Sequence, residues 1–347
     1  MKKQNTPDCK EQLLQKFPEL TPRIPDQMDY YLTGKECGNN KDCKKAVKEY
    51  NEYNECKKVN KVIEFDTTYL NVVQELIDTG TWKMNERTGK NCLFMHGGMM
   101  KFDLSTGYFP LLTTKKMAVK SMIGELIGFL RGVDNAKDFR DLKCKFWDAN
   151  ANESEHWLNN PNRKGTDDLG RIYGVQARDW KTNDGKSIDQ LGIVVDKLSK
   201  GIDDRRLIVT HWNVGELDKM ALPPCHMTYT FGIRDGYLDM CMYQRSCDLP
   251  LGIPMNVASY ALLLELIAKI TGLKAGVFTH FMWNVHIYED QFETIKEQLL
   301  RTPFNAPKLK INCDINNLED IETTLEVDDI VFEDYECHPP LLFPFAK

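Results

Sequence analysis

The sequence lacks the long apolar run that a membrane-spanning helix needs. Its most apolar stretch, residues 257–273, is interrupted by Glu265 and Lys269, whereas a spanning helix takes about 20 mostly apolar residues. The first ten residues are charged and no apolar segment follows them, so the pattern of a secretory signal is missing too. We therefore expect a cytoplasmic protein with no membrane partner.

The chain also lacks a large excess of either charge. It carries 45 Lys and Arg against 51 Asp and Glu, a formal net charge of −6 at pH 7. Proteins that hold nucleic acid through its phosphates normally carry a basic surface, so this balance argues against a dedicated nucleic-acid binder. With 42% hydrophobic residues and no low-complexity bias, the chain can bury a substantial core, which predicts a globular protein.

Closely spaced cysteine pairs are missing as well. The 11 cysteines are an odd number in a chain large enough to fold without disulfides, so we expect reduced thiols, most of them buried. Four lie within residues 1–60, namely Cys9, Cys37, Cys43 and Cys56. Their gaps do not match the two close pairs of a zinc site. No metal is therefore expected.

The first 60 residues differ from the rest and form a separate N-terminal extension. Residues 41–58 are rich in charged helix formers and predict a helix, whereas Pro and Gly in residues 21–40 favour loops. An added helical arm is the preferred interpretation of this extension. Residues 61–347 are expected to form one catalytic domain.

Residues 61–347 show mixed helix and strand patterns. Helices are predicted near residues 67–79, 116–130 and 255–271, the last of them apolar almost all round and therefore buried. Strands are predicted at residues 92–104, 207–212, 226–233 and 237–244. The segment Arg234-Asp235-Gly236 has hairpin chemistry. Because helices and strands do not alternate regularly, the pattern favours an α+β fold.

The cysteine of Leu222-Pro-Pro-Cys-His226 is a candidate nucleophile. A thiol attacks as its thiolate, so a catalytic cysteine needs positive charge nearby. On spacing alone a packed core cysteine is the commoner case. However, arginines lie on both sides of Cys225 in the sequence, in Asp204-Arg205-Arg206 and in Gln244-Arg245-Ser246-Cys247-Asp248. Three guanidinium groups could bind one phosphate and stabilise a thiolate beside it.

Other polar residues lie in apolar surroundings. Asn256 opens the predicted buried helix and could simply cap it, or its carboxamide could match the donor and acceptor edge of a uracil ring. Alternation on a strand would place His286 and Tyr288 on one face, suited to a sugar hydroxyl. Glu125 lies in an apolar helix. A buried carboxylate is costly unless it is paired or functional, so Glu125 is a candidate acid or base.

Seven segments resemble, in order and spacing, those of the thymidylate synthase family: LPPCH, DDRR, QRSCD, LGIPMN, HIY, RTG at Arg87 and GELIGFL around Glu125. The resemblance covers about residues 66–347. It implies a mixed sheet and an obligate homodimer whose two sheets pack face to face. It also implies that a one-carbon unit passes from 5,10-methylenetetrahydrofolate to C5 of dUMP, giving dTMP and dihydrofolate.

The resemblance further implies roles for single residues. Cys225 would add to C6 of dUMP, and Glu125 would organise water for proton transfers in a network with Tyr173 and His226. The nucleotide phosphate would be bound by two groups of side chains, Arg87, Arg245 and Ser246 from one subunit and Arg205 and Arg206 from the other.

The remaining implied contacts concern the ring, the sugar and the folate. Asn256 would bind the pyrimidine edge, and His286 and Tyr288 the 3′-hydroxyl. The residues implied for the folate site are Trp147, Asp248, Leu251, Gly252 and Ala346, with Asp248 bonding the pterin.

The sequence departs from the family pattern near the reacting carbon. Phe281-Met-Trp-Asn284 stands where most members have a Gly-Asp pair, Gly128 and Asn150 replace residues that are commonly aromatic, and Lys347 is a charged terminus. Lost aromatic bulk would admit water, so a hydroxymethylase giving 5-hydroxymethyl-dUMP and tetrahydrofolate is the alternative to a thymidylate synthase. The complete set of reactive residues argues against a third interpretation, a binding module with an idle site.

Overall fold

A computed structural model of the chain describes residues 65–345, and a six-stranded mixed sheet is its central feature. The strands lie in the order β1-β2-β8-β7-β6-β5, and all neighbours are antiparallel except β7 and β8. Their bounds are Thr81–Asn85 (β1), Lys90–Asp103 (β2), Ile208–Thr210 (β5), His226–Arg234 (β6), Tyr237–Asp248 (β7) and Lys274–Tyr288 (β8). The sheet and its helices confirm the α+β class.

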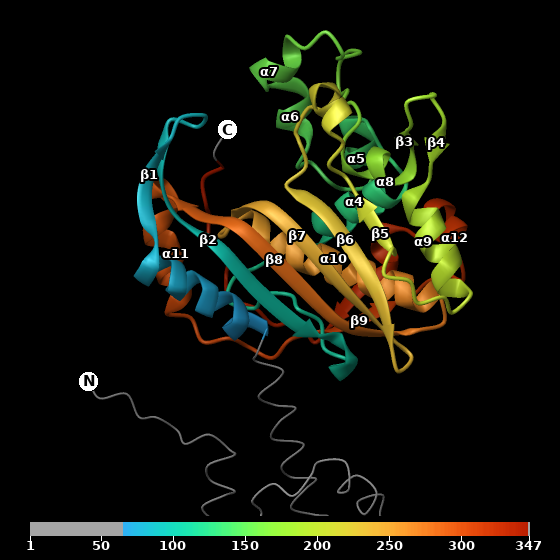
Figure 1. Cartoon of the computed structure of the whole chain (residues 1–347). Coiled ribbons are helices and arrows are strands. Elements are labelled where there is room, and N and C mark those ends of the chain that lie inside the picture. Colours follow the sequence, from blue (N-terminus) through green and yellow to red (C-terminus); the bar gives the residue numbers. More distant parts are fainter. Residues whose placement is uncertain (1–64, 346–347) are drawn as a thin grey trace, which may run out of the picture. The chain divides into compact units, whose positions relative to one another are not determined.

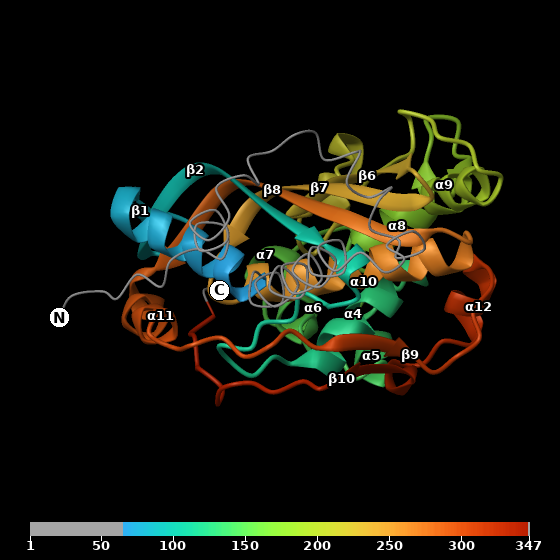
Figure 2. The same ribbon diagram turned by 90° about the horizontal axis from the view of Figure 1, so that it is seen from below.

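Helices pack on one side of this sheet, and Figures 1 and 2 show α4 and α10 there. The helices are residues 65–79, α4 (Val119–Leu130), α5 (Ala136–Asp141), α6 (Asp148–Asn152), α7 (Glu155–Leu158), α8 (Tyr173–Arg178), α9 (Gln190–Ser199), α10 (Gly252–Ile270), α11 (Phe292–Leu299) and α12 (Leu318–Thr323). Two small antiparallel ribbons complete the fold: β3 (Trp180–Lys181) with β4 (Ser187–Ile188), and β9 (Lys308–Ile311) with β10 (Ile330–Glu333).

The central helix α10 is long and apolar enough to cross a membrane by length and composition alone, with a mean hydropathy of 1.4. The expectation that no such segment exists is therefore wrong, because the mean hydropathy of the helix stays high even though it includes Glu265 and Lys269. However, 83% of that window is buried inside the protein, and α10 packs against β7 and β8. Its apolar character thus belongs to a core helix.

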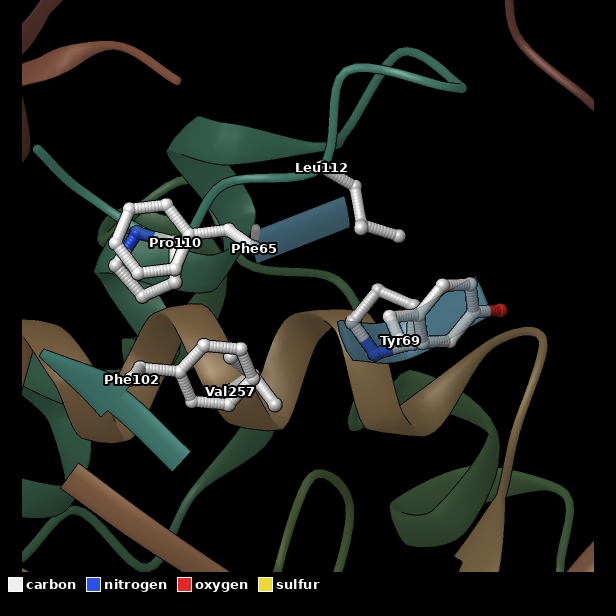
Figure 3. Close-up of a pocket in the computed structure, with 7 residues that line it drawn as sticks. Phe65, Tyr69, Phe102, Pro110, Leu112 and Val257 are labelled. Carbon is white, nitrogen blue, oxygen red and sulfur yellow. The ribbon is translucent and has the colours of Figure 1, made fainter. Parts of the chain in front are cut away.

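The helix over residues 65–79 packs onto α10 through an apolar cluster (Figure 3). The rings of Phe65 and Phe102 lie 5.9 Å apart, and the space left within the cluster is about 10 Å³, no more than one water would need. The Tyr69 hydroxyl donates to the Leu249 carbonyl at 3.0 Å. This bond fixes the helix to the turn between β7 and α10.

The predicted helices are confirmed with shifted ends. The first is present over residues 65–79, and α4 begins at Val119 within the predicted 116–130. The buried helix begins at Gly252, not at residue 255. Asn256 is therefore one turn inside α10, and the alternative that it caps the helix is wrong.

The predicted strands are also confirmed. The strand predicted at residues 92–104 is β2, Lys90–Asp103, and Gly97 within it has a φ of 86°, a conformation that glycine adopts without strain. Strand β7 extends to Asp248 rather than ending at residue 244. Between β6 and β7, Asp235 and Gly236 have φ values of 51° and 80°, as a type I′ hairpin requires.

The seven described cysteines form no disulfide. Cys92, Cys144 and Cys247 are buried, whereas Cys225, Cys241, Cys313 and Cys337 are partly exposed. The expectation that most cysteines are buried is therefore wrong for this part of the chain. The other four, the arm predicted at residues 41–58 and the boundary at residues 60 and 61 lie outside the described residues.

Candidate active site

Cys225 lies in the turn before β6, beside the guanidinium group of Arg245. Arg245 donates from Nε to the Pro224 carbonyl at 2.8 Å and from Nη2 to the Pro223 carbonyl at 2.9 Å. Its own backbone N–H donates to the Cys225 carbonyl at 3.0 Å, and its guanidinium lies 5.2 Å from the centroid of the Trp212 ring. Cys225 is partly exposed, and the Arg245 guanidinium puts a fixed positive charge on the turn that carries it.

Tyr173, the first residue of α8, supports the same turn. Its hydroxyl oxygen accepts the backbone N–H of Cys225 at 2.7 Å. Its ring is stacked 5.0 Å from Phe129 and meets Trp147 edge-on at 5.6 Å. Burial raises the pKa of Tyr173 well above its ordinary value. The phenol is thus neutral and keeps its own proton available for donation.

Glu125 approaches this aromatic group from α4. Its Oε1 accepts a hydrogen bond from Trp147 Nε1 at 3.0 Å. Burial raises the pKa of Glu125 to about 7, and the bond from Trp147 opposes part of that rise. A carboxyl group with a pKa near neutrality can both take and release a proton at neutral pH.

The space beside Gly128 is filled by Phe139 of α5. A Cβ at position 128 would lie 2.3 Å from the Phe139 ring, so glycine lets that ring approach α4. Phe139 in turn lies 5.9 Å from Trp147 and 5.8 Å from Phe129, ring to ring, and all three are buried. At position 128 another segment therefore supplies aromatic bulk.

Asn256 is held by a buried polar chain that starts on β8. Gln244 Nε2 donates to Asn256 Oδ1 at 2.9 Å, and Gln244 Oε1 lies 3.0 Å from His280 Nε2. Burial lowers the pKa of His280 to about 3, so the ring is neutral and carries its proton on Nε2. His280 therefore orients Gln244, and Gln244 orients Asn256. Sequence reasoning missed both roles, although Gln244 lies within the recognised QRSCD segment.

His226 begins β6 and packs against Tyr173 and Tyr260, at 5.2 and 5.3 Å between ring centroids. Burial, with His211 and His280 nearby, lowers the pKa of His226 to about 3. Its Nδ1 is buried without a hydrogen-bond partner. A neutral imidazole with a vacant polar atom can bond a ligand or a water molecule.

His286 and Tyr288 lie at the end of β8, with their rings 5.2 Å apart. His286 Nδ1 is 2.8 Å from Asn284 Oδ1. Arg87 is exposed in the turn between β1 and β2, and Cys92 of β2 pairs with Tyr288. A cavity of about 470 Å³ lies here, and its lining includes Arg87, Phe94, His96 and Asn284.

Arg205 and Arg206 are exposed in the turn before β5. The next residue, Leu207, accepts the backbone N–H of Phe231, which lies 231 − 225 = 6 residues along the chain from Cys225. At about 3.3 Å per residue, this turn is roughly 20 Å from Cys225. One chain therefore does not bring the two arginines to the cysteine.

Asp248 ends β7 on the other side of the site. Its Oδ1 accepts the backbone N–H of Leu251 at 3.0 Å, and Gln291 Nε2 lies 3.4 Å from its Oδ2. Burial raises the pKa of Asp248. Leu251 and Gly252 form the start of α10 next to it, and Ser246 lies two positions earlier on β7, opposite Asn284.

Lys115 and the C-terminal segment lie beside the turn between β7 and α10. The ammonium group of Lys115 donates to the Pro250 carbonyl and lies 4.6 Å from the centroid of the Phe343 ring. Burial lowers the pKa of Lys115 to about 8. Gln291 Nε2 also donates to the Pro344 carbonyl at 2.9 Å. Ala346 lies outside the described residues.

Metal ligands do not gather in the part of the chain that the structure describes. Among residues 65–345, no three His, Cys, Asp or Glu side chains are placed to hold a metal ion. The cysteines of the N-terminal extension, which were weighed as zinc ligands, lie outside this range.

Comparison with known proteins gives a consistent result. A model of the thymidylate synthase family matches residues 67–347. Thymidylate synthases of Idiomarina loihiensis, Histophilus somni and Psychromonas ingrahamii are each 50% identical to the chain over 279 residues, which is 80% of this chain and 99% of the relative.

Proposed function

Because the chain belongs to the thymidylate synthase family, we propose that the Cys225 thiolate forms the covalent bond to dUMP in the reaction of that family. The chain is a one-carbon methyltransferase that converts dUMP to dTMP. One observation carries the role of Cys225. The two hydrogen bonds from Arg245 to the carbonyls of Pro223 and Pro224 hold a cation at the turn that carries Cys225, and positive charge nearby favours the thiolate.

The covalent step makes C5 of the uracil reactive. The Cys225 sulfur bonds to C6, and the C5–C6 electron pair moves toward C5 and O4. C5 bonds the methylene carbon of the co-substrate as the bond from that carbon to N10 breaks, and C5 then loses its proton as the bond to N5 breaks. A hydride from the folate reduces the methylene carbon, and elimination of the thiolate from C6 restores the ring double bond. Splitting the reaction in this way avoids a direct attack by a poorly nucleophilic carbon.

The side chains around Cys225 support these steps. Glu125, with a pKa of about 7, moves a proton through water toward O4, and Tyr173 and His226 complete that polar network. Asn256 accepts from the ring N3–H while its own N–H donates to O4, because Gln244 fixes the orientation of its amide. His286 and Tyr288 bind the 3′-hydroxyl.

The co-substrate of the family is 5,10-methylenetetrahydrofolate, which supplies the carbon and the hydride that reduces it. The residues present fit this molecule. Asp248 offers a carboxylate for pterin N–H groups, and Leu251 and Gly252 follow it at the start of α10. Trp147 offers an aromatic ring next to Glu125. Gln291 contacts both Asp248 and the Pro344 carbonyl, so the C-terminal segment lies on the Asp248 side.

Reduction rather than hydration completes the reaction. The relatives are named thymidylate synthases, and the ring of Phe139 fills the space beside Gly128 where water was expected to enter. The hydroxymethylase alternative is therefore not favoured.

The active form is a homodimer in which the partner supplies Arg205 and Arg206 to the phosphate bound by Arg87, Arg245 and Ser246. The distance of roughly 20 Å along β6 supports this proposal. So does the sheet face opposite α10, where Met99, Phe281 and Trp283 are 49%, 42% and 50% exposed. Exposed aromatic and apolar side chains on one sheet face are typical of an interface.

The test is Cys225→Ser, with Cys313→Ser as a matched control at another partly exposed cysteine. Turnover is followed by the absorbance rise of dihydrofolate with dUMP and methylenetetrahydrofolate. We expect Cys225→Ser to fold and bind dUMP but to lose at least about 10³-fold in kcat, because a serine alkoxide is hard to form.

Two results would contradict the proposal. Turnover of Cys225→Ser at the level of Cys313→Ser would remove Cys225 as the nucleophile. Consumption of dUMP without any rise in dihydrofolate would show that water, and not hydride, completes the reaction.

A further inference from the structure

Gln291 joins three parts of the site that are far apart in the sequence. It ends the short turn Glu289–Gln291 after β8, and its side chain is fully buried. Its Oε1 accepts the backbone N–H of Tyr288 at 3.0 Å, while Nε2 contacts the Pro344 carbonyl at 2.9 Å and Asp248 Oδ2 at 3.4 Å. One side chain therefore touches the sugar-side strand, the pterin-side carboxylate and the C-terminal segment.

Each contact uses a different hydrogen-bonding position of the amide. The oxygen accepts from the backbone, and the two N–H groups serve one carbonyl and one carboxylate, which a carboxamide can satisfy at the same time. A carboxylate at position 291 would offer no donor and would add a second negative charge next to Asp248. A buried amide that loses one partner leaves an unpaired polar group, so the contacts depend on one another.

The C-terminal segment comprises residues 342–345, the end of the described chain. Phe343 is buried against Lys115, but Leu342 and Phe345 on either side are exposed. Lys115 in turn bonds the Pro250 carbonyl, in the turn that follows Asp248. The segment is thus attached to the Asp248 side of the site by Lys115 and Gln291.

We propose that Gln291 is a positioning residue that couples the C-terminal segment to the Asp248 carboxylate. The inference rests on the proposed function, in which Asp248 binds the pterin. Under this coupling the segment near Pro344 and the orientation of the Asp248 carboxylate stabilise each other through the Gln291 amide. Loss of Gln291 should then weaken folate binding while leaving the nucleotide contacts near Cys225 intact.

The first test compares Gln291→Leu with Gln298→Leu in the full-length protein. Gln298 is equally buried, but its Nε2 donates to Thr114 at 3.0 Å and reaches neither Asp248 nor the segment. We expect Gln291→Leu to raise the KM for methylenetetrahydrofolate about tenfold or more, and to change the Kd for dUMP less than that, because on the nucleotide side only the backbone N–H of Tyr288 loses its acceptor. Gln298→Leu should change neither.

A double-mutant cycle with Phe343→Ala tests the route of the effect. If Gln291 acts through the segment, the two substitutions share one interaction, and the folate KM of the double variant should resemble that of the stronger single variant. Effects that multiply would show independent roles and would overturn the coupling.

Gln291→Glu keeps the shape of the side chain and serves if Gln291→Leu does not fold. It places a carboxyl group next to Asp248, so the folate KM of this variant should rise with pH across neutrality more steeply than that of the wild type. A purely structural role would not change the pH profile.

The outcomes separate the two proposals. If the wild type turns over dUMP while Gln291→Leu behaves like Gln298→Leu, the coupling is overturned and the proposed function stands. If the wild type itself fails to turn over dUMP, the proposed function fails first.

Discussion

The proposed site has two halves that differ in the charge of their buried polar groups: one half holds neutral groups, and the other holds groups that can be charged. The half proposed to bind the nucleotide consists of Cys225, His226, Gln244, Asn256 and His280. Burial lowers the pKa values of its two imidazoles to about 3, and its amides cannot ionise. The half proposed to bind the folate consists of Lys115, Asp248, Gln291 and Phe343. Burial lowers the pKa of its lysine and raises the pKa of its carboxyl group.

The difference has a physical consequence. Imidazoles and amides that stay neutral keep the same hydrogen bonds across the range around neutral pH, so the chain from His280 through Gln244 to Asn256 keeps its geometry. Burial disfavours the charged form, so a buried lysine loses its proton and a buried carboxylate gains one more easily than in water. In the folate half, Lys115 contacts Phe343, and Asp248 is joined to Pro344 through Gln291. We infer that the nucleotide half is rigid and that the folate half is the adjustable one.

Arg245→Lys should give the largest effect and would break the rigid half. An ammonium group cannot reproduce the paired hydrogen bonds to Pro223 and Pro224, so the turn that carries Cys225 loses its support. We expect kcat/KM for dUMP to fall about 10²-fold or more, since two charge-assisted bonds are lost. Steady-state kinetics measure this.

Arg234→Lys is the matched control for that change. Arg234 makes a similar pair of bonds to Asp239 from the exposed end of β6, where such pairs contribute little. Its kcat/KM should stay near that of the wild type. An equal loss of kcat/KM in the two variants would show that the hydrogen bonds of Arg245 to Pro223 and Pro224 are not specifically needed for turnover.

Asn256→Asp should have an intermediate effect confined to ring selectivity. Gln244 Nε2 can still donate to the oxygen at this position, so the fold of α10 should be kept, but the group facing the ring changes its hydrogen-bonding character. We expect turnover of dUMP to fall at least about tenfold and the preference to move toward dCMP. Competition between the two nucleotides measures it, and unchanged selectivity would mean that the ring edge is bound elsewhere.

Lys115→Met should have the smallest effect, a change in how thermal stability depends on pH. It tests whether a buried group in the folate half changes its charge near neutral pH. The pKa of Lys115 is about 8 in the folded protein against 10.5 when exposed. Between these values the unfolded chain binds more protons, so this group makes the wild type more stable as pH rises. The Tm of the wild type minus that of Lys115→Met should therefore increase by a few degrees over this range.

Thermal melts at matched pH values measure this difference. Groups that titrate in both proteins cancel in this Tm difference, so the change of the difference with pH is due to Lys115. A constant difference would show that Lys115 titrates as an exposed lysine does and that the folate half is no more adjustable than the nucleotide half.

Local patterns in the sequence predicted the elements better than the contacts. The hairpin after Arg234 and the buried helix α10 follow from turn chemistry and apolar periodicity, which act over a few residues. The same reasoning placed Asn256 at the helix start, because nothing local showed that Gly252 already belongs to α10. Gly128 was interpreted as an opening for the same reason, since Phe139 reaches it from another helix.

The residues that sequence reasoning missed share one property. Gln244, His280 and Gln291 act by bonding other side chains or backbone groups on different elements. Gln244 stood inside a recognised segment, but His280 and Gln291 carried no local signal beyond a polar residue near apolar neighbours. Their roles became visible only when strands β7 and β8 and the chain end were seen together.

The sequence by itself determined the α+β class and the family, and it predicted the reactive groups, because turn chemistry, apolar periodicity and motif spacing are all properties of neighbouring residues. Only the tertiary structure decided that Arg245 supports the turn of Cys225, that Phe139 fills the space beside Gly128 and that Gln291 links Asp248 to the chain end. These contacts depend on distances between segments, and burial, which sets the charge of each group, exists only after the chain has folded.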